Sequence, residues 1–249
     1  MTDFSYQLYS SRNFDLGDTL KMLGRLGYKQ AEGFGGLFAD DAAVSKLKAG
    51  LDANGLTMPT IHIGYADVRD TPDRVLKICK TLGVKAVFVP HLMPADRPSD
   101  AAGWKAFGAA LSKAGQPLRD AGMDFGWHNH DFEFKALPDG SLPQDHIFAG
   151  NDLSVELDVA WVVRGGKDPI AWIQANADRI IAAHVKDIAP AGQNADEDGW
   201  ADVGHGVVPW ASIMAALRKT PCRYFVMEHD NPKDHERFAT RSIAAAKTL

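Results

Sequence analysis

The chain alternates short apolar segments with longer segments of helical periodicity, and the alternation repeats eight times. The apolar segments are typical of buried strands and lie at residues 4–8, 28–33, 58–63, 84–89, 123–126, 153–159, 179–186 and 224–227. The helical segments lie at residues 15–26, 42–54, 71–82, 101–121, 143–148, 168–177, 209–219 and 232–247. Because parallel strands need crossover connections, this order predicts a parallel α/β fold.

The length of 249 residues is typical of one closed barrel of eight strands and eight helices. No Pro-rich or Gly-rich linker and no shift of composition divides the chain. The sequence therefore predicts an α/β fold of the (β/α)8 TIM barrel type, with residues 1–249 as a single domain. Residues 190–206 form a polar stretch that is longer than a plain connection needs, so we expect a functional loop there.

Charge and composition exclude several classes of function. The net charge of -5 leaves no basic footprint for nucleic acid or an anionic membrane. No apolar run approaches the roughly 20 residues that span a bilayer. The two cysteines, Cys79 and Cys222, indicate a reduced compartment without a disulfide framework. Because the first residues also lack the features of a signal peptide, we expect a cytoplasmic protein.

Acidic and imidazole side chains gather at the ends of four successive predicted strands. The four clusters lie at residues 127–134, 156–158, 184–187 and 228–230. In a barrel of this type, the C-terminal ends of the strands carry the active site. Strand alternation places Glu156 and Asp158 on one face, and His184 and Lys186 on one face of the next strand. A buried carboxylate is costly without a partner, and a divalent cation is the simplest partner for several acids and an imidazole.

We expect Glu133, Asp158, His184 and Glu228 to be the metal ligands. Carboxylate oxygens with one imidazole suit Mn²⁺, Mg²⁺, Co²⁺ or a catalytic Zn²⁺ better than a Cys-rich structural zinc site. Glu133 lies beyond its strand and would have to fold back, so His128 at the strand end is its competitor. Glu32 and His62 are expected to line a substrate pocket, although Glu32 could simply pair with a neighbouring cation and His62 could be a hydrogen-bonded core residue. Trp161 could stack on a sugar ring or pack in the rim.

An ordered set of motifs runs through these clusters. The motifs are Gln7-Leu8-Tyr9-Ser10, His128-Asn129-His130-Asp131-Phe132-Glu133-Phe134, Leu157-Asp158-Val159-Ala160-Trp161, His184-Val185-Lys186-Asp187 and Val226-Met227-Glu228. Together they resemble the sugar phosphate isomerase/epimerase family, the xylose-isomerase-like TIM barrels, over essentially the whole chain. The resemblance implies a divalent metal held by acids from strands five, six and eight and a histidine from strand seven.

The chain departs from the ketose 3-epimerases that it resembles at Asn129-His130. Those enzymes have a glutamate where His128 stands, and that glutamate serves them as both ligand and acid/base. We expect His130 to be the base, because an imidazole titrates near neutral pH. Glu228 is the second acid/base candidate, as a carboxylate that can shift off the metal. Lys186 would hold a hydroxyl or an oxyanion. His128 is either a ligand or a catalytic group.

The predicted function is that of a metal-dependent isomerase or epimerase acting on a sugar or keto-sugar derivative, by α-proton abstraction through a metal-stabilised enediolate. A lyase of the inosose-dehydratase or 3-keto-sugar type would share that first step, and a metal-free sugar-binding barrel is a third reading. The expected partners are a small sugar substrate and a second copy of the chain in a homodimer, with no nucleic acid and no membrane.

Overall fold

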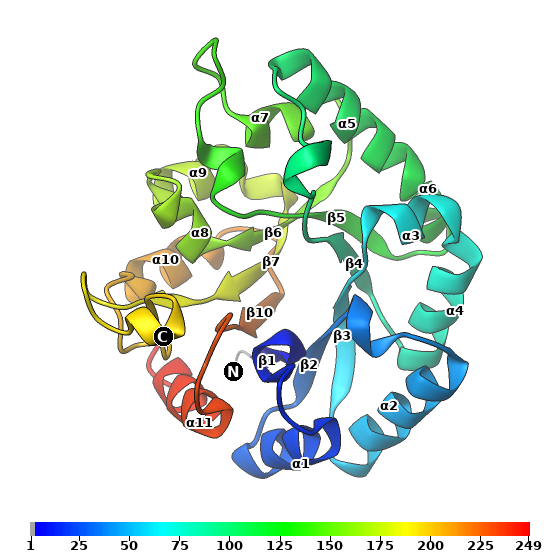
Figure 1. Cartoon of the computed structure of the whole chain (residues 1–249), viewed down its shortest axis with the longest axis vertical. Helices are drawn as coiled ribbons and strands as arrows, with labels where there is room; N and C mark the ends of the chain where they lie inside the picture. The colour runs from blue at the N-terminus through cyan, green and yellow to red at the C-terminus, as the bar shows by residue number, and fades with distance from the viewer. Residues whose placement is uncertain (1–2) are drawn as a thin grey trace.

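The computed structural model describes residues 3–249 and is a closed barrel of eight parallel strands with helices around it (Figure 1). The strands are β1 Phe4–Gln7, β2 Gln30–Phe34, β3 Thr57–His62, β4 Ala86–Val89, β5 Asp124–His128, β6 Ser154–Asp158, β7 Ile180–Val185 and β10 Tyr224–Met227. Each strand pairs with its neighbours in chain order, and β1 closes the barrel against β10. The predicted TIM barrel is confirmed.

The main helices outside the barrel follow the predicted segments. They are α1 Leu16–Leu26, α2 Asp41–Ala53, α4 Pro72–Leu82, α5 Ala101–Ala114, α7 Pro143–Ile147, α9 Pro169–Ala175, α10 Trp210–Leu217 and α11 His235–Ala246. Local chemistry sets their ends. The Asp15 side chain accepts the amide of Asp18 at the start of α1, and Gly27 ends that helix at φ 93°. Gly83 ends α4 in the same way at φ 77°.

Three helices differ from the expected pattern. The predicted helix 101–121 is broken at Gly115, and α6 Gln116–Asp120 follows the break. A Cβ atom at Gly115 would lie 1.9 Å from the Phe125 ring, so this point of the helix packs directly on β5. Two further helices were not predicted: α3 Tyr65–Asp70 and α8 Val159–Arg164. Asp158 begins α8, since its Oδ1 accepts the amide of Trp161.

The long loop after β7 contains a small antiparallel hairpin of β8 Asp187–Ile188 and β9 Trp200–Ala201. Asp187 holds the end of this loop. Its carboxylate accepts the amides of Gly204, Gly206 and Val208 at 3.0–3.1 Å. These hydrogen bonds fix the position of the hairpin next to the C-terminal end of β7.

The apolar core has two parts. The larger part fills the space between the barrel and the helices. A smaller cluster of Ala86, Phe88, Ile181 and Ala182 packs with Tyr224. Strand alternation puts Ala182 on the same face as His184. The interior of the barrel also holds buried polar side chains, since Gln7 and Thr60 lie in register with Glu32. No helix within residues 3–249 has the length and apolar character needed to cross a membrane.

Replacement of Gly126 should destabilise the barrel. Gly126 in β5 pairs with Ser154 in β6, and a Cβ atom there would lie 1.9 Å from the Ser154 carbonyl oxygen. Because that neighbour is backbone, Gly126→Ala should cost about 1–3 kcal/mol or more of the free energy of unfolding, as overpacking does. Urea denaturation measures the loss. The control is Gly35→Ala, where a Cβ atom meets nothing within 4 Å. Equal stability of both variants would contradict the prediction.

Candidate metal centre

Six strands bring acids and imidazoles to the C-terminal end of the barrel. Glu32 comes from β2, His62 from β3, His128 from β5, His184 from β7, and Glu228 directly follows β10. The strand β6 supplies both Glu156 and Asp158, on one face as the sequence predicts. All seven side chains are buried. Two overlapping sets of these residues bring their donor atoms within 4.8 Å of one another.

The first set, which we call the carboxylate-rich group, consists of Asp158, His184 and Glu228. His184 Nδ1 lies 2.9 Å from Glu228 Oε2 and 3.8 Å from Asp158 Oδ2. Asp158 Oδ1 is used as the cap of α8, but Oδ2 is buried without a hydrogen-bond partner. An orphaned carboxylate oxygen beside an imidazole and a second carboxylate fits a divalent cation. The three ligands expected from these strands therefore lie together.

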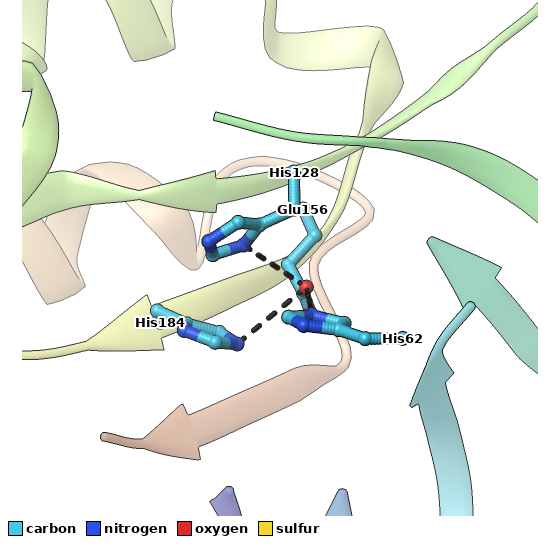
Figure 2. Close-up of side chains that lie close together, drawn as sticks. All are labelled: His62, His128, Glu156 and His184. Atoms are coloured by element: carbon cyan, nitrogen blue, oxygen red, sulfur yellow. Dashed lines mark hydrogen bonds and ion pairs between the residues drawn. The ribbon is translucent and has the colours of Figure 1, made fainter. Parts of the chain in front are cut away.

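The second set, the imidazole-rich group, consists of His62, His128, Glu156 and His184 (Figure 2). The three rings surround one oxygen of Glu156. Glu156 Oε2 lies 2.5 Å from His62 Nε2, 3.1 Å from His128 Nδ1 and 3.5 Å from His184 Nε2. His184 belongs to both groups, with Nδ1 facing one and Nε2 facing the other. The sequence reasoning gave Glu156 no role, although its position on the Asp158 face was the available signal.

Glu32 lies deeper than the pocket that it was expected to line. Its Oε1 accepts a hydrogen bond from Gln7 Nε2 at 2.7 Å and lies 2.8 Å from His184 Nε2 and 3.2 Å from His62 Nε2. Although burial opposes the change, the charges of His62 and His184 lower the pKa of Glu32 to about 2. Glu32 is therefore a buried anion beneath the imidazoles.

Lys186 is fully buried, and its ammonium is already engaged. It donates to Asp230 at 2.6 Å and to Glu228 at 3.1 Å, and it lies 4.2 Å from the centre of the Trp200 ring. Burial alone would lower the pKa of Lys186, but Asp230 and Glu228 outweigh it and raise the pKa. The side chain neutralises and fixes these carboxylates, which differs from the expected contact with substrate.

Glu133 lies outside both groups. Its Oε1 accepts the indole N–H of Trp127 at 3.0 Å and its Oε2 accepts the amide of His130 at 2.9 Å. The carboxyl group thus faces back into the loop that follows β5 and supports it. Burial raises the pKa of Glu133 to about 8. The position of Glu133 does not support its expected role as a metal ligand. Of the two candidates from strand five, only His128 lies in a group of side chains that could hold a metal ion.

His130 lines the pocket, but its basicity differs from the expectation. Burial, and after it the charge of Lys186, lower the pKa of His130 to about 3. Its Nδ1 is buried without a hydrogen-bond partner. The ring is therefore neutral at ordinary pH and has a free nitrogen, yet it is a weaker base than a solvent-exposed imidazole.

Asp158 and Glu156 resist ionisation because they are buried, whereas the charges of Lys186 and His184 lower the pKa of Glu228 well below its ordinary value despite burial. Burial raises the pKa of Asp158 to about 6, with Lys186 and His184 opposing it. Burial and the charge of Glu32 raise the pKa of Glu156 to about 8. Both shifts indicate that the positive charge beside these two carboxyl groups does not offset their burial. A bound cation would relieve this deficit.

A pocket of 520 Å³ opens above these groups. Its lining residues are Tyr9, Arg12, Phe34, Gly35, His62, Gly64, Pro90, His91, His128, His130, Trp161, Asp198, Glu228 and Asp230. His62, His128, His130, Trp161 and Glu228 were expected at the site. Tyr9, Arg12, Asp198 and Asp230 were not expected there, and only Tyr9 and Asp230 lay in motifs that the sequence singled out.

Residues 20–248 match the family described as xylose isomerase-like TIM barrels. The chain belongs to this family. None of the curated proteins matches the chain. The matched residues include the strand ends that carry both groups.

Several solved structures share the fold of this chain at low sequence identity. A sugar phosphate isomerase/epimerase from Parabacteroides distasonis is 21% identical, with a TM-score of 0.82 over 99% of this chain and 93% of that chain. The probable 3-DHS dehydratase AsbF involved in petrobactin synthesis from Bacillus anthracis is 15% identical, with a TM-score of 0.71 over 99% of both chains. A D-psicose 3-epimerase is 13% identical, with a TM-score of 0.70 over 99% of this chain and 98% of that chain.

Glu133→Gln should lower stability and leave metal binding intact. The glutamine would place an amide N–H against one of the two N–H donors, which costs about 1–3 kcal/mol. Between the ordinary carboxyl pKa of 4.5 and about 8, the folded state keeps the Glu133 proton that the unfolded state loses. The contribution of this group to stability therefore falls as pH rises through that window, and the glutamine variant lacks this fall.

Urea denaturation at both ends of that pH window measures the effect. The stability difference between wild type and Glu133→Gln should shrink at the upper end. Glu236→Gln is the control, since Glu236 is exposed and pairs with Arg25 at the surface. Loss of bound metal in Glu133→Gln would restore this residue as a ligand.

Proposed function

We propose that this chain is a metal-dependent isomerase or epimerase acting on a sugar or keto-sugar derivative. The observation that carries the proposal is the carboxylate-rich group next to the pocket, with the orphaned Asp158 Oδ2 facing His184 and Glu228. Glu228 belongs to this group and also lines the pocket, so a cation held there would be close to a bound substrate. Family membership supports the same reading.

Asp158, His184 and Glu228 would hold the cation. When bound, a divalent cation at this position supplies a Lewis acid for a carbonyl oxygen and a template for an adjacent hydroxyl. Lys186 holds Glu228 and Asp230 in place through its hydrogen bonds, which would orient Glu228 toward a cation and the pocket. Trp161 offers a ring face to a sugar at the pocket wall.

His130 is the proposed base. Its neutral ring and free Nδ1 can accept a proton from the carbon next to the carbonyl. Its lowered pKa makes this transfer efficient only if the substrate C–H is strongly acidified, which is the contribution that carbonyl polarisation makes. Glu228, which also lines the pocket, is the second acid/base candidate. Return of the proton to the other face or to the neighbouring carbon would give the epimer or the isomer.

A lyase is the second candidate, and His128 favours it. Position 128 carries an imidazole that lies in the pocket and against Glu156, so no carboxylate from β5 faces Glu228 across a substrate. Loss of a group from the β-carbon after the same proton abstraction would then give an unsaturated product. The first step is shared, and only the product separates the two reactions.

Removal of metal should abolish activity, and Mn²⁺, Co²⁺ or Mg²⁺ should restore part of it. Asp158→Asn should weaken metal binding by more than the roughly 10–100-fold that loss of an outer-shell partner costs. Metal content after dialysis measures this. The matched control is Asp198→Asn, because Asp198 lines the same pocket but belongs to neither group. Full metal content in Asp158→Asn would contradict the proposal, and a metal-free protein that binds sugars would favour the non-catalytic barrel.

His130→Ala should lower turnover by at least about 10²-fold, the lower end of the range for loss of a general base, while binding metal normally. The assay is a panel of keto-sugars in D2O, with deuterium incorporation next to the carbonyl followed by NMR. The control is His146→Ala, since His146 contacts Ser141 away from the pocket. Wild-type turnover in His130→Ala would remove this residue from the mechanism. Unsaturated products would identify the lyase.

Two expectations stay predictions. The homodimer would be tested by light scattering against the monomer mass of 27.0 kDa. A cytoplasmic location would be tested by fractionation of the producing cell.

A further inference from the structure

Glu32 and Glu156 are fully buried carboxylates with an unusual set of neighbours. Within residues 3–249, their only ion-pair partners are the imidazoles of His62, His128 and His184. The carboxylates of the other group differ, because Lys186 lies within 3.7 Å of both Asp158 and Glu228. Burying two carboxylates without a permanent cation is costly. Compensation comes from imidazolium ions, from protonation of a carboxylate or from a metal.

The geometry of the imidazole-rich group favours a metal. Three ring nitrogens from β3, β5 and β7 converge on the carboxylate that β6 supplies (Figure 2). Their donor atoms and Glu156 Oε2 all lie within 4.8 Å of one another. Two further oxygens beside them, Glu156 Oε1 and Glu32 Oε2, are buried without hydrogen-bond partners. A cation can take such carboxylate oxygens as additional ligands.

The two groups have different donor chemistry. The carboxylate-rich group offers two carboxylates and one imidazole, which suits Mn²⁺ or Mg²⁺. The imidazole-rich group offers three imidazoles and one carboxylate, with a second carboxylate, Glu32, next to them. Nitrogen ligands select Zn²⁺, Co²⁺ and similar ions over Mg²⁺. The charges of Glu32 and Glu156 would balance one divalent ion.

We propose that His62, His128, Glu156 and His184 form a second divalent-cation site that selects zinc-type ions, and that His184 bridges the two sites through its two ring nitrogens. His184 Nδ1 lies 2.9 Å from Glu228, and His184 Nε2 lies 2.8 Å from Glu32 and 3.5 Å from Glu156. Occupation of both sites requires the ring to lose its remaining N–H proton, which passes to solvent as the second ion binds. The bridge makes His184 the single residue that both ions need.

The second site gives His128 a role. A glutamate at this position would add a carboxylate to the strand-five side of the pocket. The imidazole instead directs Nδ1 to Glu156, 3.1 Å away, and completes the deeper set of nitrogen ligands. The inference goes beyond the proposed reaction, because it concerns ion binding in the absence of any sugar.

Metal stoichiometry tests the proposal. Metal-stripped protein is equilibrated with excess Zn²⁺, or with Co²⁺, and the ion retained after dialysis is measured by mass spectrometry. Wild type should retain two equivalents. His62→Gln and Glu156→Gln should each retain one, Asp158→Asn should also retain one, and His184→Gln should retain none. His91→Gln is the control, because His91 lines the same pocket but belongs to neither group, and it should retain two.

The visible absorption of bound Co²⁺ gives an independent readout. The spectrum should lose the component of the nitrogen-rich site in Glu156→Gln and keep it in Asp158→Asn. Circular dichroism checks that each variant is folded, and the near-isosteric Glu156→Gln serves if His62→Gln does not fold. One equivalent in wild type, or two in Glu156→Gln, would overturn the second site. These measurements use no substrate, so failure to find a sugar reaction would leave them unaffected.

Discussion

Uncompensated negative charge at the C-terminal end of the barrel is the constraint on which the site depends. The carboxylates of Glu32, Glu156, Asp158 and Glu228 are all buried there, and Lys186 is the one lysine or arginine that pairs with any of them within residues 3–249. Such charges are stable in a protein interior only if they are paired or protonated. Despite burial, nearby positive charges lower the pKa values of Glu32 and Glu228, but burial raises those of Asp158 and Glu156, so these two carboxyl groups carry the deficit of positive charge. Divalent cations would remove it, which links stability of this region to function.

The surroundings of the site are built to hold these charges in place. Lys186 is clamped between Asp230, Glu228 and the Trp200 ring. The loop that carries Trp200 is in turn fixed by the Asp187 carboxylate and by Arg237, which pairs with Glu197 and Asp202. These hydrogen bonds and ion pairs hold the loop, and with it the Trp200 ring that packs against the Lys186 ammonium group. This rigidity is what a metal site and an oriented carboxylate require.

The sequence was a good guide to the scaffold and a partial guide to the site. Strand alternation and the motifs predicted that Asp158, His184 and Glu228 would meet. They could not predict the direction of Glu133, because its carboxyl group is held by Trp127 and by the His130 amide in a loop without periodicity. The helix break at Gly115 and the extra helix after Asp158 were also missed, although Pro117 in the first turn of α6 and Asp158 as the cap of α8 were the signals for them.

The sequence by itself determined the eightfold strand–helix order, the barrel and the end of it that carries the chemistry, because periodicity and strand direction are local properties. Only the tertiary structure decided which donor atoms meet. It turned Glu156 and three imidazoles into one cluster, gave His184 a neighbour on each ring nitrogen, and lowered the pKa of His130 to about 3 through burial and the charge of Lys186. Contacts between strands far apart in the chain, and the exclusion of water around them, are set by packing and leave no trace in local sequence.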